Sequence, residues 1–256
     1  VKIPTSSDAR TSASTSLHDR KNINVNTSIN GRNQETNSAE TKILDSYDRL
    51  LQEKSSFHFG YPYNLMYDHS ELYEFMKYSI NNLGDPYITS NYAVHSRQFE
   101  CAVIDFFAEL WEADKLSCDS SKPQTLDDSD DDSELPYWGY VTTSGTEGNL
   151  HGILMGRERF RPNAILYMSS ETHYSVFKAA NYYRMDCRVI PTTANGEIDY
   201  DLLEQELQKN HDVEAILNVN IGTTVKGAVD NLDRIVDILK RNEIPRERYH
   251  IHCDGA

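Results

Sequence analysis

Short apolar runs alternate with amphipathic stretches through the second half of the chain. Strand-like runs are predicted at 137–143, 164–168, 187–190, 213–219 and 249–253, and helical periodicity is found between them at 145–160, 172–185, 201–208 and 230–240. Short strands that alternate with helices form right-handed βαβ units. This half is therefore predicted to be an α/β domain, with a mostly parallel sheet and helices on both of its faces.

The first half of the chain shows helical patterns without strands. A helix is predicted from about residue 43, a turn at 60–63, a second helix at about 69–81 and a third from about 96. The third helix has one apolar face, which is formed by Phe99, Val103, Phe106, Phe107, Leu110 and Trp111. The segment 41–116 is therefore predicted to be an N-terminal helical segment.

Two segments lack the pattern of a packed domain. Residues 1–40 are rich in Ser, Thr and Asn, with almost no large apolar side chains, and are predicted to be a disordered tail. A plastid transit peptide is the alternative, but the four acidic residues of this segment argue against it. Between 119 and 134 lie seven acidic residues and one lysine, so the segment 117–136 is predicted to be an acidic surface insertion. The remaining segment, 137–256, is the α/β domain.

Charge and composition exclude several classes of protein. The chain has 40 acidic and 25 basic residues and a formal net charge of −15, which argues against a general binder of nucleic acids or of anionic membranes. No run approaches the roughly 18 uninterrupted apolar residues of a membrane span, and no signal peptide opens the chain. We therefore expect a cytoplasmic protein that binds neither nucleic acid nor membrane.

The four cysteines (Cys101, Cys118, Cys187 and Cys253) are scattered and form no C-x-x-C pair. They are expected to be reduced thiols, and no metal site is predicted.

Four segments with candidate chemistry fall at the carboxyl ends of predicted strands, where ligands bind in parallel α/β sheets. The first is TSGTEGN at 143–149, where a strand leads into a helix whose first N–H groups can bind an anion. Considered alone, it could be a simple Ser or Thr helix cap. Gly145 allows a tight turn there, and the Thr146 hydroxyl adds a donor.

The other three segments contribute an imidazole, hydroxyls and a carboxylate. His173 lies just past the strand at 164–168, the sequence NIGTT at 220–224 ends another strand, and Asp254 ends the last one. Each is a weak signal by itself, because a lone His is more often a capping residue and a Gly-Thr-Thr run is often a turn. Together they place a phosphate cradle, an imidazole, a hydroxyl and a carboxylate at one edge, which is what a charged aromatic phosphate cofactor requires.

Long ordered motifs carry a resemblance to a known family. They are HFGYPYNL, SINNLGDPYITSNYAVHSRQFE, SGTEGNLHGILMGRERF, THYSVFKAANYYRM, GEIDYDLL, AILNVNIGTTVKGAVD and YHIHCDGA. From about residue 53 to 256, except for the acidic insertion, the chain resembles group II pyridoxal 5'-phosphate (PLP) amino-acid decarboxylases. Within that family it is similar to the branch of plant serine decarboxylases and histidine decarboxylases.

The resemblance implies a fold-type I PLP enzyme, usually an obligate homodimer, with an amino acid as its substrate. It implies that Gly145, Thr146 and Glu147 hold the cofactor phosphate through the helix N-terminus. His173 would stack on the pyridine ring beside the substrate, and Asp254 would pair with the ring nitrogen as the second catalytic residue. The resemblance also implies that Ala256 packs against the opposite ring face and that Thr224 lies near the ring oxygen or the substrate carboxylate.

The family pattern leaves the substrate and the completeness of the site open. L-Serine to ethanolamine is the leading reaction, and histidine to histamine is the rival, because these motifs recognise the cofactor and not the side chain. The family's Schiff-base lysine follows a Ser-x-His motif beyond Asp-Gly-Ala, so the chain is expected to be a fragment without that lysine, the last strands and the C-terminal domain. A catalytically dead remnant that pairs with intact subunits is therefore a second interpretation, and a fold-type I aminotransferase or lyase is a third.

Overall fold

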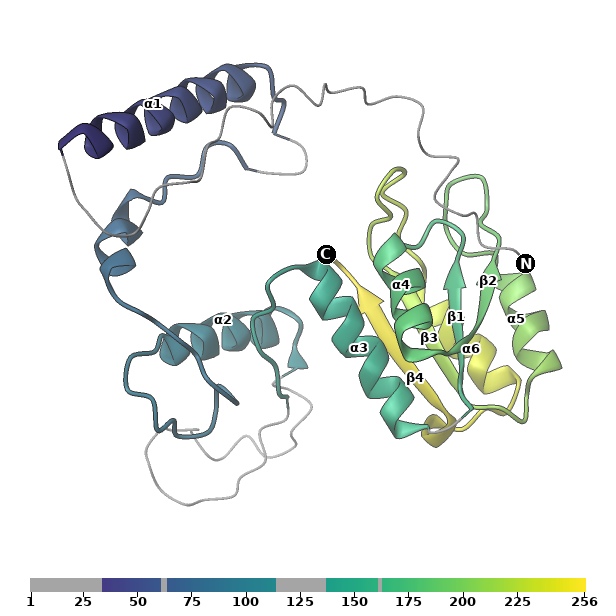
Figure 1. The fold of residues 1–256 in the computed structure, drawn as a ribbon. Helices are drawn as coiled ribbons and strands as arrows, with labels where there is room; N and C mark the ends of the chain where they lie inside the picture. Colours follow the sequence, from purple (N-terminus) through teal and green to yellow (C-terminus); the bar gives the residue numbers. More distant parts are fainter. Residues whose placement is uncertain (1–33, 61–63, 114–136, 161–162) are drawn as a thin grey trace. The chain divides into compact units, whose positions relative to one another are not determined.

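The computed structural model describes residues 34–60, 64–113, 137–160 and 163–256. The chain divides into two compact units, 1–78 and 79–256, which are described separately (Figure 1). The acidic insertion predicted at 117–136 and most of the tail predicted at 1–40 lie outside the described residues. Among the described helices, none is long and apolar enough to cross a membrane.

The first unit contains α1 (Gln34–Ser56) and the 3-10 helix η2 (Ser70–Lys77). The predicted start of the first helix at 43 is wrong, because α1 begins at Gln34, within the predicted tail. Residues 34–56 contain neither Gly nor Pro, so their polar composition does not prevent helix formation. The second helix ends earlier than the predicted residue 81, since Tyr78 closes η2 with an N–H donated to Phe75 O.

The second unit begins with a short irregular segment that a buried arginine holds in place. Arg97, the first residue of α2 (Arg97–Leu110), is only 6% exposed. Its guanidinium donates to the carbonyl oxygens of Leu83 (2.7 Å), Asp85 and Ile88. These bonds fix the loop that leads into α2, a helix whose start agrees with the prediction from about residue 96.

The strand predicted at 137–143 is wrong, because this segment is irregular in the structure. Two of its backbone N–H groups bond to side chains. Val141 N donates to Glu100 Oε1 (2.9 Å), and Thr143 N donates to Glu147 Oε2 (2.8 Å). An apolar run becomes a strand only where a neighbouring strand accepts its backbone hydrogen bonds.

The remaining predicted elements are confirmed, with ends that differ by a few residues. Four parallel strands lie in the order β2-β1-β3-β4. The strands are β1 (Ile165–Ser169), β2 (Asp186–Ile190), β3 (Ala215–Asn220) and β4 (Tyr249–Asp254). The helices are α3 (Gly145–Arg159), α4 (Tyr174–Tyr183), α5 (Tyr200–Lys209) and α6 (Leu232–Arg241), and the short 3-10 helix η4 (Arg246–Arg248) precedes β4.

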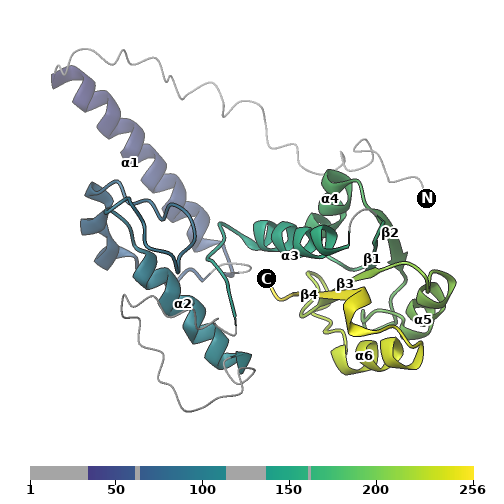
Figure 2. The ribbon, with the colours of Figure 1, turned by 90° about the horizontal axis from the view of Figure 1, so that it is seen from below.

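Side chains of the central strands alternate between two hydrophobic cores, one on each face of the sheet. Leu166 and Met168 of β1 pack with α3 and α4, whereas Ile165 and Tyr167 pack with α5 and α6. Figure 2 shows α3 and α4 on one side of the sheet and α6 on the other. The period of two along the strands is the one that a sheet covered on both faces requires.

The order of the strands marks one edge of the sheet as the expected ligand position. The chain passes from β1 to β2 through α4 and then returns past β1 to β3 through α5. Because parallel crossovers are right-handed, reversal of direction puts the two helices on opposite faces. The direction reverses between β1 and β3, and the carboxyl ends of the strands at such a point are the usual ligand position in parallel α/β sheets.

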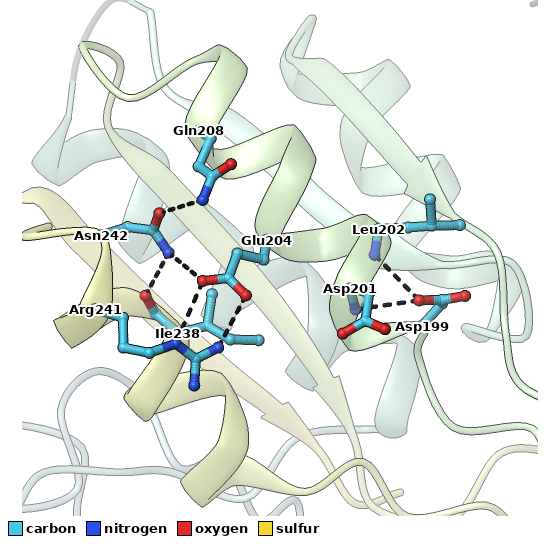
Figure 3. Close-up of polar contacts among 8 residues, drawn as sticks. All are labelled: Asp199, Asp201, Leu202, Glu204, Gln208, Ile238, Arg241 and Asn242. Atoms are coloured by element: carbon cyan, nitrogen blue, oxygen red, sulfur yellow. Dashed lines mark hydrogen bonds and ion pairs between the residues drawn. The ribbon is translucent and has the colours of Figure 1, made fainter.

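Polar contacts connect α5 and α6 on the outer surface of their layer (Figure 3). Glu204 accepts hydrogen bonds from Arg241 Nη2 (2.9 Å) and Asn242 Nδ2 (2.9 Å), and Gln208 Nε2 donates to Asn242 Oδ1 (2.9 Å). The Arg241 hydrogen bond, with help from Asn242, lowers the pKa of the Glu204 carboxyl. Asp199 caps the start of α5. These contacts stabilise the face that is opposite α3 and α4.

Candidate functional site

The N-terminus of α3 meets the end of β4 at the carboxyl edge of the sheet (Figure 1). A Cβ placed on Gly145 would lie 2.4 Å from Ala256 Cβ, so only glycine fits at the first position of α3. The Ser144 side chain makes no capping hydrogen bond. The start of α3 therefore has N–H groups that no Ser144 cap occupies, beside a small residue at the end of β4, and this arrangement suits an anionic group.

Glu147 is predicted to bind the cofactor, but its side chain is already hydrogen-bonded to Thr143. Its Oε2 accepts hydrogen bonds from Thr143 N (2.8 Å) and Thr143 Oγ1 (2.7 Å). These two hydrogen bonds, the backbone bond first, lower the pKa of the Glu147 carboxyl. The carboxylate thus stabilises the turn into α3. Glu147 N itself donates to Ser144 O (3.0 Å), so an anion at this place would interact with the backbone N–H groups of Gly145 and Thr146.

Two further glycines let α3 approach β4 closely. A Cβ on Gly152 would lie 2.2 Å from His252 Nδ1, and one on Gly156 would lie 2.8 Å from His250 Cδ2. The imidazole of His250 bonds through Nε2 to Gly152 O (3.0 Å). Glycines at 145, 152 and 156 thus form the face of α3 that packs on β4, and this face fixes how far α3 lies above the strand.

A hydrogen-bonded network joins the two predicted catalytic residues. Asn149 of α3 is 3% exposed, and its Nδ2 donates to Asp254 Oδ2 (2.9 Å) and to Ser175 Oγ (2.9 Å). Ser175 Oγ lies 2.7 Å from His173 Nδ1. Asn149 Oδ1 lies 2.7 Å from His252 Nε2. Three elements (the N-terminus of α4, the first turns of α3 and the end of β4) are therefore held in one arrangement.

A second buried network supports the ends of β1 and β3. Asp230 is 3% exposed and accepts hydrogen bonds from Asn220 N (2.8 Å), Asn220 Nδ2 (2.8 Å) and Ile198 N (2.7 Å). Asn220 Nδ2 also donates to Ser169 Oγ (3.1 Å). A buried carboxylate is tolerated when several N–H groups bond to it. This network fixes the carboxyl ends of β1 and β3 relative to each other.

The structure brings most of the predicted site residues together. Gly145 contacts Ala256, and His173 is joined to Asp254 through the network. Thr224 lies exposed in the loop that follows β3, and the first N–H of that loop, from Ile221, donates to Asp254 O (2.7 Å). The structure describes no cluster of three or more His, Cys, Asp or Glu side chains that could hold a metal ion.

Sequence reasoning missed three residues of the site: Asn149, Ser175 and His252. A signal for two of them exists in the sequence. Asn149 follows Gly145 by four residues and precedes Gly152 by three, so all three share one helix face, and His252 shares a strand face with Asp254. Ser175 has no such signal, because its partner is known only once α3 and α4 are packed.

These residues fit a cofactor with a phosphate and a protonated aromatic nitrogen. The start of α3 suits the phosphate, the half-buried carboxylate of Asp254 suits a cationic ring atom, and Ala256 leaves space beside it. His173 lies partly exposed at the N-cap of α4. An imidazole at this place can stack on a flat ring.

The two partly buried histidines of β4, His250 and His252, predict a pH dependence of stability. Burial is the largest cause that lowers the pKa values of both His250 and His252. The unfolded chain, in which the pKa of each histidine is about 6.5, therefore takes up protons that the folded protein does not bind. As the pH falls below about 6.5, this proton uptake lowers the free energy of unfolding. We expect urea denaturation to give a steeper loss of unfolding free energy between about pH 7 and 5 for wild type than for His250→Gln. Equal slopes would contradict the inference that partial burial keeps His250 in its neutral form.

Comparisons with known proteins agree with this geometry. Residues 69–256 match the pyridoxal-dependent decarboxylase conserved domain. The chain is 51% identical to serine decarboxylase 1 of Oryza sativa subsp. japonica over 222 residues, which are 87% of this chain and 42% of that protein. It is 43% identical to a histidine decarboxylase of Solanum lycopersicum, over 84% of this chain and 48% of that protein. The chain thus spans less than half the length of these two relatives.

A solved structure shows the same fold. The L-methionine decarboxylase of Streptomyces sp. 590 superposes with a TM-score of 0.70 at 24% sequence identity, over 85% of this chain and 54% of that one. At this identity the likeness concerns the fold alone, and it confirms the predicted α/β architecture of fold-type I.

Proposed function

Because the chain belongs to the pyridoxal-dependent decarboxylase family, we propose that the protein binds PLP at the carboxyl edge of the sheet and decarboxylates an amino acid. The observation that carries the proposal is the hydrogen-bonded link between His173 and Asp254 beside the N-terminus of α3. An anion site, an imidazole and a carboxylate are thus held at one edge, which is the combination that PLP requires.

In this proposal each side chain has one task. The N–H groups at the start of α3, with Gly145, Thr146 and Glu147, bind the phosphate. Asp254 pairs with the ring nitrogen and holds a proton there, and PLP, when bound, supplies the sink for the electron pair left when carbon dioxide departs.

Residues on either side of the ring complete the arrangement. His173 stacks on one face, next to the substrate. Ala256 lies against the other face, beside Gly145, where a Cβ on residue 145 would meet it. Thr224 lies in a loop anchored to the end of β4 and bonds to the ring oxygen or the substrate carboxylate.

We propose L-serine as the substrate, with ethanolamine as the product. The support is the identity of 51% to a serine decarboxylase, compared with 43% to a plant histidine decarboxylase. Histidine is the second candidate, since the residues described above would contact the cofactor and leave the substrate side chain undetermined. The predicted cytoplasmic location stays a prediction.

We also propose that the whole protein is a homodimer. Apolar side chains of α2 and of its C-cap residue support this, because Phe99, Phe106 and Trp111 are well exposed within the described residues. Exposed apolar side chains on one helix commonly mark an interface.

The proposal is tested on protein made from the complete coding sequence and loaded with PLP. We expect release of carbon dioxide from L-serine with formation of ethanolamine, a slower or absent reaction with L-histidine, and a mass in solution of two subunits. Faster formation of histamine than of ethanolamine would make L-histidine, and not L-serine, the substrate. PLP binding without any decarboxylation would favour the non-catalytic interpretation. Failure to bind PLP would overturn the proposal as a whole.

A further inference from the structure

Asn149 has a fixed set of donors and acceptors in the network. An amide has two N–H groups on its nitrogen and accepts only at its oxygen. The two contacts of Nδ2, to Asp254 Oδ2 and Ser175 Oγ, therefore use both N–H groups. Its oxygen, at 2.7 Å from His252 Nε2, must then accept from that nitrogen, so His252 carries its proton on Nε2.

The same logic extends through Ser175 to His173. Ser175 Oγ accepts from Asn149, so its own O–H is left to donate, and the atom within reach is His173 Nδ1 at 2.7 Å. The backbone N–H of Ser175 also donates to Nδ1, at 3.3 Å. An imidazole nitrogen that accepts two hydrogen bonds carries no proton, so the ring proton of His173 is on Nε2.

The environment of the network supports this order. Asn149 and Ser175 are 3% and 0% exposed, so water does not exchange freely with these bonds. Burial, which lowers the pKa of His252 against the opposing effect of Asp254, favours the neutral ring that the network requires. The α3 backbone keeps Asn149 directed at Asp254 and His252, because on either side of it, at Gly145 and Gly152, the helix lies so close to the end of β4 that not even a Cβ would fit.

We propose that Asn149 is a positioning residue that sets the proton positions of the site. Its amide holds Asp254 by a donated hydrogen bond and, through Ser175, makes His173 a neutral imidazole with its proton on Nε2. The consequence for a bound ring rests on the proposed function: a neutral, fixed imidazole would stack without placing a second positive charge beside the protonated ring nitrogen. The proton positions themselves do not rest on it.

The experiment records long-range proton–nitrogen NMR correlations of the histidine rings in cofactor-free protein made from the complete coding sequence. Labelling of histidine with nitrogen-15 makes each tautomer visible, and a His173→Gln variant identifies the signals of His173. In wild type we expect His173 to have one ring proton, on Nε2.

Asn149→Asp is the variant that reverses the network. The new carboxyl group faces Asp254 and has at most one proton, which it shares with that carboxylate. Towards Ser175 it can therefore only accept, so the Ser175 hydroxyl donates to it and can then only accept from His173. We expect the His173 proton to move to Nδ1 or a second proton to appear there. Ser175→Ala, a smaller change, removes the hydroxyl donor but keeps the longer bond from the backbone N–H of residue 175, so we expect the Nε2 tautomer to stay the major one and a minor Nδ1 tautomer to appear. The packing control is Ile153→Val, a fully buried residue of the same helix, which should leave the His173 signals unchanged.

The outcomes separate the inference from the proposed function. A proton on Nδ1 of wild-type His173 overturns the inference. An unchanged His173 spectrum in Ser175→Ala also overturns it, and this variant tests the network even if Asn149→Asp does not fold. If wild type does not bind PLP, the proposed function fails while the spectra still decide the tautomer. In loaded protein, we expect Asn149→Asp to lower the decarboxylation rate by about tenfold or more, since a misplacement of about 1 Å costs up to 10²-fold, and Ile153→Val to change it little.

Discussion

Asp254→Ala is expected to reduce decarboxylation by about 10²- to 10³-fold or more, the range found when one preorganised electrostatic contact to a reacting group is lost. The fold should survive, because Asp254 is the last residue of β4 and its side chain lies at the edge of the sheet. The hydrogen bond from Asn149 Nδ2 and a longer one from Ala256 N (3.4 Å) are lost, and this costs about 1–3 kcal/mol of stability. The effect on the rate should therefore greatly exceed the effect on folding.

The measurement is the rate of carbon dioxide release together with the PLP content and the thermal unfolding curve of the same sample. Asp186→Ala is the matched control, because Asp186 is an exposed acid at the opposite end of a strand of the same sheet. It should keep both rate and cofactor. A near-normal rate in Asp254→Ala would contradict the role of this carboxylate, while an unfolded variant would contradict its position at the edge.

Gly152→Val is expected to have the largest effect on stability. Its Cβ would lie 2.2 Å from His252 Nδ1, so α3 must move away from β4. Overpacking in a core costs about 1–3 kcal/mol or more, and here it also breaks the bonds from Asn149 to Asp254 and His252, which lie on the same face. We expect a lower midpoint in urea and weaker PLP binding.

Gly148→Ala is the matched control on the same helix. A Cβ at this position would meet only Thr142 Oγ1, at 3.9 Å, an ordinary contact. Alanine favours a helix over glycine by about 1 kcal/mol, so the variant should be as stable as wild type or slightly more stable. Equal stability of Gly152→Val and Gly148→Ala in urea would show that α3 does not approach β4 as closely as the structure has it.

The elements that the pattern predicted well are those whose burial repeats along the chain. The strand predicted at 213–219 is observed as β3 (Ala215–Asn220), and the helix predicted at 145–160 is observed as α3 (Gly145–Arg159). In α3 one buried residue recurs about every turn, and in β3 successive side chains face the cores on the two sides of the sheet. Local sequence and tertiary burial therefore agree. The errors occur where no such repeat exists. At 137–143 an apolar run has side-chain partners in place of a neighbouring strand, and at 34–42 a polar segment without Gly or Pro is helical.

The sequence by itself determined the α/β fold, the family, and most of the residues expected at the candidate site, because motif order and hydrophobic period are properties of the chain alone. Only the tertiary structure decided how those residues are connected. Asn149 and Asp254 are 105 positions apart, and Asn149 and Ser175 are 26 apart. A hydrogen bond depends on distances of a few tenths of an ångström and on which atom donates. Neither is encoded in residue type, so the network exists only once the glycine face of α3 has packed on β4.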